Sequence, residues 1–252
     1  MRGIRVGPRK RVNVAEPSSR FQEVQIPLDE PVGGVSTVSG VLGVPEWWPT
    51  GSRVGVVLAH AAGRDMNDPL VEGLQRRLTE RKYLALRFNF PFAEAGKSRA
   101  DAMPALERAF RQAVAVLARD PSAAPAHLFV GGVGLGAQVA VQAAATRLRV
   151  DGVIALGYPL HGRDEPTKNV RAEPLYRLVS PILFVQGARD RNCDIDTLKR
   201  TLTRVGVPKT LHTIAEADNV LAVPRRSGRP TEDVHLEVLE AVDIWMRSVL
   251  GA

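Results

Sequence analysis

The chain has 252 residues, of which 44% are hydrophobic and 24% are charged. This length and composition can bury one substantial core, so a single domain accounts for the chain. One cysteine, Cys193, excludes an internal disulfide framework, and the basic, glycine-rich amino terminus has no continuous apolar segment typical of a secretory signal or a membrane span. We therefore expect a cytoplasmic protein without a membrane anchor.

The formal net charge of +7 is concentrated at the amino terminus. Residues 1–20 contain six basic residues and one acidic residue, which leaves a charge of only +2 for the rest of the chain. We predict a flexible basic tail at 1–20 and a single domain at 21–252. The tail could contact nucleic acid or another acidic partner through charge alone, although a tail that is only solvated is the simpler interpretation.

The first elements are predicted to be strands. Segments 21–28 and 35–44 favour β structure, and the proline and glycines between them indicate an opening hairpin. A loop follows that contains Trp47 and Trp48, which we expect to be buried by packing, with a binding surface as the alternative. The run VGVVLA at 54–59 is typical of a central strand covered on both faces.

The rest of the chain alternates between helices and strands. We expect helices at 70–81, 100–118, 197–205 and 231–249, strands at 83–90, 153–157, 182–186 and 209–215, and a loop at 91–98. Such alternation without an internal repeat favours a mainly parallel sheet flanked by helices.

Residues 127–146, HLFVGGVGLGAQVAVQAAAT, form the most informative stretch. They indicate a short apolar strand, a glycine-rich turn and an alanine-rich helix. The residue at the apex of such a turn lies at the carboxyl edge of the sheet, where ligands bind. The nucleophile-elbow motif G-x-S-x-G fits residues 132–136, with Gly134 where a hydrolase has its serine. The sequence predicts the elbow without its nucleophile.

Two other interpretations of this turn remain open. Gly132, Gly134 and Ala137 also fit the dinucleotide fingerprint G-x-G-x-x-[GA], which needs an acidic residue at the end of the next strand. Asp151 precedes that strand, so we expect no dinucleotide cofactor. The glycines could also serve only a tight turn and close helix packing.

No group of His, Cys, Asp and Glu residues has the spacing of metal ligands, so we expect no metal.

Four further motifs follow in a recognisable order: HAAGRDMNDP at 60–69, GYPLH at 157–161, LFVQGARDRNCD at 183–194 and IAEADNVLAV at 214–223. With the elbow, they resemble the dienelactone-hydrolase-like group of the α/β-hydrolase superfamily, which contains a testis-expressed protein and a subunit of the NSL chromatin-acetylation complex. The resemblance covers roughly residues 53–252. It implies an α/β fold of the α/β-hydrolase type, with a mainly parallel central sheet and an opening β-hairpin.

The resemblance places the catalytic triad of the family on Gly134 as the nucleophile, Asp190 as the acid and Asn219 as the histidine. Serine hydrolysis needs a hydroxyl group to attack, an imidazole to carry its proton and a carboxylate to orient the imidazole. Glycine offers no nucleophile, and an amide does not titrate near neutral pH. We therefore expect a pseudoenzyme, non-catalytic or impaired, that keeps its pocket for a small-molecule ligand or serves as an interaction module.

The resemblance also implies an oxyanion hole. His60 follows the third strand at the position of a family histidine, so the backbone N–H groups of Ala61 or Ala62 and of Leu135 could still offer donors there. The simpler interpretation of His60 is that it holds its loop by local hydrogen bonds.

An active hydrolase of small esters, thioesters or lactones would need substitute groups. His161 could act as a base and Cys193 as a nucleophile, although a small buried thiol is the stronger expectation for Cys193. The remaining histidines, His127, His212 and His235, lie at the opposite sheet edge, within the last strand and on the closing helix, and are predicted to be structural.

Overall fold

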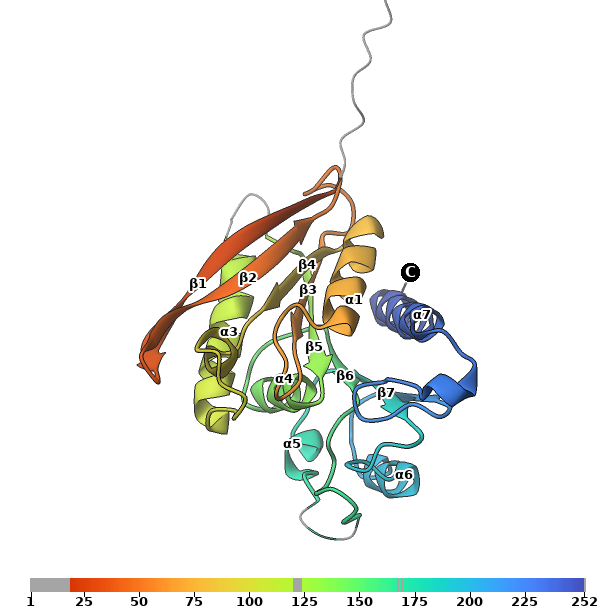
Figure 1. Ribbon diagram of the computed structural model, residues 1–252. Helices are drawn as coiled ribbons and strands as arrows, with labels where there is room; N and C mark the ends of the chain where they lie inside the picture. Colours follow the sequence, from red (N-terminus) through yellow and green to blue (C-terminus); the bar gives the residue numbers. More distant parts are fainter. Residues whose placement is uncertain (1–18, 120–123, 167, 169, 252) are drawn as a thin grey trace, which may run out of the picture.

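A sheet of eight strands lies at the centre of the computed structural model, which describes residues 19–119, 124–166, 168 and 170–251 (Figure 1). The strand order is β1-β2-β4-β3-β5-β6-β7-β8. The pairs β1–β2 and β2–β4 are antiparallel, and all the others are parallel. The mainly parallel sheet predicted from the sequence is therefore confirmed.

The strands are β1 (Arg20–Val32), β2 (Val35–Val44), β3 (Val54–Ala59), β4 (Leu84–Phe88), β5 (His127–Val133), β6 (Gly152–Leu156), β7 (Ile182–Gly187) and β8 (Lys209–Ile214). The helices are α1 (Pro69–Glu80), α2 (Pro91–Glu94), α3 (Met103–Ala118), α4 (Leu135–Ala145), α5 (Glu173–Tyr176), α6 (Ile195–Leu202), α7 (Thr231–Leu250) and a 3₁₀ turn, η1 (Arg225–Ser227).

Helices cover both faces of the sheet (Figure 1). On one face, apolar residues of α3 and α4 such as Phe110 and Val139 pack on the sheet with Phe88. On the other face, Leu74 of α1 and Val238 of α7 belong to a second cluster. Because helices cover both faces of the sheet, the central strands consist of continuous apolar residues. Every residue of β3 is buried.

The opening hairpin is confirmed, but its first strand is longer than predicted. Gly33 and Gly34 form the turn with positive φ angles of 58° and 91°, which glycine adopts without a steric cost. β1 continues beyond residue 28 to Val32, with a change of register after Pro27. A bulge of this kind lets a strand continue past a proline such as Pro27, which has no backbone N–H to donate to the neighbouring strand.

Several helix boundaries differ from the sequence-based prediction. α2 lies inside the segment predicted as a loop, and α3 begins at Met103 with Pro104 in its first turn, where a missing N–H needs no acceptor. α6 begins at Ile195, because the side chain of Asp194 accepts the backbone N–H of Thr197 at 2.7 Å and caps the helix there.

The two adjacent tryptophans have different environments. Trp48 packs against the main hydrophobic cluster, as predicted. Trp47 is 64% exposed, so the prediction that it would be buried was wrong. It lies in a turn with a positive φ of 61°, outside the cluster that Trp48 joins.

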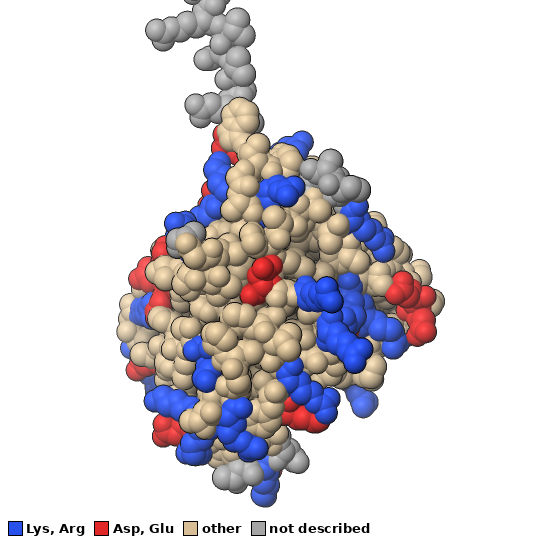
Figure 2. Space-filling model, turned by 180° about the vertical axis from the view of Figure 1, so that it is seen from behind, with Lys and Arg blue, Asp and Glu red and all other residues tan. Residues whose placement is uncertain are grey.

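Within the described residues, no helix is long and apolar enough to cross a membrane. The predicted basic tail falls almost entirely on residues 1–18, which lie outside the described part of the chain, so it stays a prediction. On the rest of the molecule, acidic side chains are interspersed among the basic ones over the face seen in Figure 2. Surface pairs such as Arg108–Glu30 are consistent with this mixed surface.

Close contact between α4 and β3 positions the turn after β5. A Cβ atom at Gly132 or at Gly136 would lie 2.4 Å from the carbonyl oxygen of Ala59. Real Cβ atoms do not approach an oxygen this closely, so only glycine permits the packing at these two positions.

We predict that Gly136→Ala lowers the free energy of unfolding by about 2 to 4 kcal/mol, because the added methyl group forces α4 away from Ala59. The matched control is Gly73→Ala in α1, where a Cβ would meet only the His235 ring at 3.8 Å. An alanine in that helix should raise stability by up to about 1 kcal/mol. Urea unfolding of both variants measures the difference, and a stabilising Gly136→Ala would contradict the contact.

Candidate functional site

Gly134 adopts the strained conformation of an elbow. Its φ and ψ are 56° and −111°, and its N–H donates to the carbonyl of Leu156 at 2.8 Å. A residue with a Cβ atom pays about 1 to 3 kcal/mol in such a region, whereas glycine does not. A Cβ at this position would lie 3.4 Å from the Cβ of Ala61, an ordinary contact. The turn therefore has room for a side chain that the sequence does not supply.

Two backbone N–H groups lie beside this turn. Leu135 is the first residue of α4, and Ala61 follows β3. In the part of the chain that the structure describes, neither N–H donates a hydrogen bond to the protein. Donors in these positions could contact a ligand oxygen placed over Gly134.

A cavity of about 270 Å³ opens at the elbow. Gly134, Leu135, Ala61 and Ala62 line it, together with Asn219. Gly134 and Asn219, on which the resemblance places the nucleophile and the histidine, thus line one cavity. The structure brings together the backbone donors and these two positions, but Asp190 does not line the cavity.

His60 is a structural histidine, as the simpler interpretation predicted. It is fully buried, and its Nε2 accepts the backbone N–H of Phe90 at 3.0 Å while Nδ1 donates to the carbonyl of Ala61 at 2.9 Å. Burial lowers the pKa of His60, which favours the neutral ring. His60 therefore holds Ala61 in place and has no nitrogen free for a ligand.

The loop that carries Asn219 packs tightly onto the ends of β6 and β7. A Cβ at Gly157 would lie 2.2 Å from the carbonyl oxygen of Asn219, and a Cβ at Gly187 would lie 2.3 Å from that of Asp218. The carboxylate of Asp218 accepts the N–H of Val220 at 3.0 Å. Among the described residues, the Asn219 side chain makes no hydrogen bond with protein, so it is available to a ligand in the cavity.

Asp190 is held by its own turn. One carboxylate oxygen accepts the side-chain N–H of Gln186 at 2.5 Å, and the other accepts the backbone N–H of Asn192 at 2.7 Å. Gln186 in turn accepts the N–H of Tyr158 at 3.0 Å. Burial raises the pKa of Asp190 to about 6, although these hydrogen bonds oppose the shift. The carboxylate orients no histidine and ties β7 to the loop after β6.

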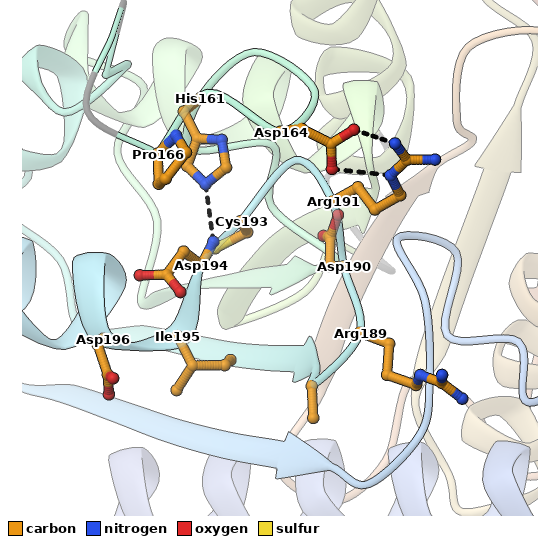
Figure 3. A pocket seen from close by; sticks show the side chains of 11 residues that line it. His161, Asp164, Pro166, Arg189, Asp190, Arg191, Cys193, Asp194, Ile195 and Asp196 are labelled. Atoms are coloured by element: carbon orange, nitrogen blue, oxygen red, sulfur yellow. Dashed lines mark hydrogen bonds and ion pairs between the residues drawn. The ribbon is translucent and has the colours of Figure 1, made fainter.

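A second cavity, of about 460 Å³, lies beside the acid loop and contains the two candidate substitutes (Figure 3). The Nε2 atom of His161 accepts the N–H of Asp194 at 2.7 Å, and its Nδ1 donates to the carbonyl of Gly162 at 2.7 Å. Cys193 is 1% exposed, and burial raises the pKa of its thiol. The structure thus places His161 outside the elbow cavity, contrary to the expectation, and confirms Cys193 as a buried thiol.

The dinucleotide-site interpretation has no support in the geometry. Asp151 lies at the amino end of β6, where it accepts the N–H of Leu128 at 2.7 Å, so it cannot complete a dinucleotide fingerprint at the carboxyl edge. His127 lies beside it at the same distant edge. Within the described residues, no group of three or more His, Cys, Asp and Glu side chains could hold a metal ion.

Sequence reasoning missed three polar residues of the elbow cavity, Gln138, Arg171 and Asn192, and the role of Gln186. Gln138 lies four residues after Gly134, and the helical repeat could have placed it over the turn. Arg171 comes from a polar loop without periodicity, and Asn192 lies in a turn between β7 and α6, so neither carries a local signal.

The fold and the elbow define an α/β-hydrolase architecture, and the similarity of the chain to known proteins agrees with it. Residues 52–247 match the model of the family described as alpha/beta hydrolase domain, so the chain belongs to the α/β-hydrolase family. Solved structures with a similar fold include an α/β serine hydrolase without a lid from Xanthomonas campestris, with 22% identity, a TM-score of 0.65, and 90% of this chain and 95% of that chain covered.

Two further structures support the same fold. Dienelactone hydrolase from Anabaena variabilis has 18% identity and a TM-score of 0.65, with 88% of this chain and 96% of that chain covered. An esterase from Pyrococcus furiosus has 14% identity and a TM-score of 0.68, with 90% and 93% covered. The chain therefore has a dienelactone-hydrolase-like fold, as the motif resemblance predicted.

The raised pKa of Asp190 predicts that the stability of the protein depends on pH. Because the folded protein binds a proton at about pH 6 that the unfolded chain binds near pH 3.8, Asp190 favours folding at pH 4, and this contribution is lost as the pH rises through 6. The free energy of unfolding of Asp190→Asn, taken relative to the wild type, should be about 1 to 2 kcal/mol higher at pH 7 than at pH 4, allowing for screening by solvent. Urea unfolding at both pH values measures it.

The control for this measurement is Asp196→Asn, which changes an exposed aspartate on the neighbouring helix α6. The pH dependence of Asp190→Asn should exceed that of this control. A pH-independent difference for Asp190→Asn would show that the pKa of this carboxyl is the same in the folded and unfolded states, and would contradict the prediction.

Proposed function

We propose that this protein is a non-catalytic member of the α/β-hydrolase family that binds a small molecule in the elbow cavity. The observation that carries the proposal is Gly134, which keeps the strained φ and ψ of the elbow and lines a cavity with unpaired backbone N–H donors, yet has no nucleophile. The site supports binding of an oxygen-bearing ligand without covalent attack.

The absence of a proton carrier supports the same proposal. Asn219 stands at the histidine position and faces the cavity, but its amide cannot accept a proton near neutral pH. Asp190 is engaged by Gln186 and Asn192. The nucleophile and base needed to form and break an acyl intermediate are therefore both missing from these positions.

A hydrolase that uses substitute groups is less well supported. Both ring nitrogens of His161 are engaged by backbone groups, so proton transfer would break a hydrogen bond. The raised pKa of the buried Cys193 keeps it as a neutral thiol, which is a poor nucleophile. Neither residue lines the elbow cavity. The predicted cytoplasmic location and an acidic partner of residues 1–20 stay predictions.

The purified protein should not hydrolyse short acyl esters, thioesters or lactones above the uncatalysed rate, and a fluorophosphonate should leave no label on it. The measurement is product release at rising protein concentration, with Asp190→Ala and Cys193→Ala run in parallel. Saturable turnover that disappears in Cys193→Ala would overturn the proposal in favour of thiol catalysis.

Restoring residues at the elbow tests whether only the chemistry has been lost. Gly134→Ser should lower the free energy of unfolding by about 1 to 3 kcal/mol because of its positive φ, without giving esterase activity. Gly134→Ala is the matched control, with the same backbone strain and no hydroxyl group.

Adding Asn219→His to Gly134→Ser should give fluorophosphonate labelling of the introduced serine and measurable ester hydrolysis, both of which depend on Asp190. The triple variant that also carries Asp190→Ala should be much less active. A folded double variant that never labels would indicate that the cavity itself no longer accepts a substrate.

A further inference from the structure

The side chains that line the elbow cavity carry positive charge and no negative charge. Its charged lining residue is Arg171, while Gln138, Asn192 and Asn219 supply neutral amides, and no aspartate or glutamate lines it. The neighbouring cavity differs, because aspartates and arginines line it together. Figure 3 shows the carboxylate of Asp164 paired with an arginine there. Positive charge without a carboxylate thus distinguishes the elbow cavity.

Arg171 is fixed in position by its own loop. Its Nη1 donates to the carbonyls of Pro159 at 3.0 Å and His161 at 2.9 Å, and its backbone N–H donates to Leu160 at 2.6 Å. The hydroxyl of Tyr158 donates to the Arg171 carbonyl at 3.0 Å. Arg171 is exposed at the mouth of the cavity, and among the described residues no carboxylate forms an ion pair with its guanidinium, whose Nε and Nη2 have no protein acceptor. It is a positioned cation without a counter-ion.

The backbone donors at the elbow complement this cation. The N–H groups of Ala61 and Leu135 have no acceptor in the described protein, and glycine at 134 leaves the space over them free of a side chain. An anionic oxygen is the ligand that such N–H groups favour. The apolar side chains of Leu135 and Val220 line the same cavity and could contact a short hydrocarbon chain.

We propose that the ligand of the elbow cavity is a small monocarboxylate with a short acyl chain, and this inference rests on the proposed function. The carboxylate group binds among the Ala61 and Leu135 N–H groups and the Arg171 guanidinium. The acyl chain lies against Leu135 and Val220. One cation matches one negative charge, and the cavity of about 270 Å³ suits a compact molecule.

The test uses butyrate and its neutral isostere butyramide as probes of the full-length protein, with binding followed by ligand-observed NMR. Butyrate should bind at least tenfold more tightly than butyramide, and its affinity should fall as the salt concentration rises. Arg171→Gln should abolish this preference, and Arg171→Lys should retain part of it.

The matched control is Arg163→Gln, which removes the same charge from the same loop at a position that does not line the cavity. Its affinity for butyrate should stay within twofold of the wild type. Ala62→Leu, which fills the cavity from an exposed position, should abolish binding of both probes and so locate the site.

The outcomes separate this inference from the proposed function. Equal affinity for butyrate and butyramide, or an unchanged preference in Arg171→Gln, would overturn the carboxylate assignment while leaving a ligand-binding cavity. No saturable binding of either probe, or of short neutral esters and lactones, would overturn both. If Arg163→Gln lost the preference for butyrate over butyramide as fully as Arg171→Gln, the preference would depend only on the overall charge of the protein. That result would also overturn the carboxylate assignment.

Discussion

The close approach of helix α4 to the carbonyl oxygen of Ala59 is the constraint on which the site depends. Gly132 and Gly136 each allow this approach, because a Cβ at either position would lie 2.4 Å from that oxygen. With the helix held there, the chain between β5 and α4 must turn sharply at Gly134, and Leu135 begins the helix at the edge of the cavity. The constraint lies in the flanking glycines, so it survives the absence of a serine. Glycine at the apex also relieves the strain that an elbow serine bears.

The retention of Asp190 has a structural explanation. A buried carboxylate without a histidine partner is costly, as its raised pKa indicates. Its bonds to Gln186 and Asn192 offset part of this cost and connect β7 with the turn that follows it. Removal of the carboxylate would leave these donors unsatisfied, so Asp190 has a structural role that does not depend on catalysis.

The sequence predicted the features that depend on local patterns. Apolar runs located the central strands, and the glycine spacing at 132–136 located the elbow, because both follow from backbone geometry. Arg171 and Gln186 escaped prediction, since their roles depend on contacts with backbone groups that no periodicity reveals. The exposure of Trp47 was missed because hydrophobicity predicts burial only on average, and the turn that holds this residue carries no periodicity.

Binding at the elbow without reaction is the property that distinguishes the proposed function from that of a hydrolase. Proton NMR of monoethyl succinate, which carries a carboxylate and an ester in one molecule, tests this with both readouts in one sample. With protein in near-stoichiometric amounts, we predict saturable line broadening of the ester signals and no release of ethanol above the protein-free rate. The Ala62→Leu variant should remove the line broadening. Release of ethanol at a rate proportional to the protein concentration would contradict the proposed function.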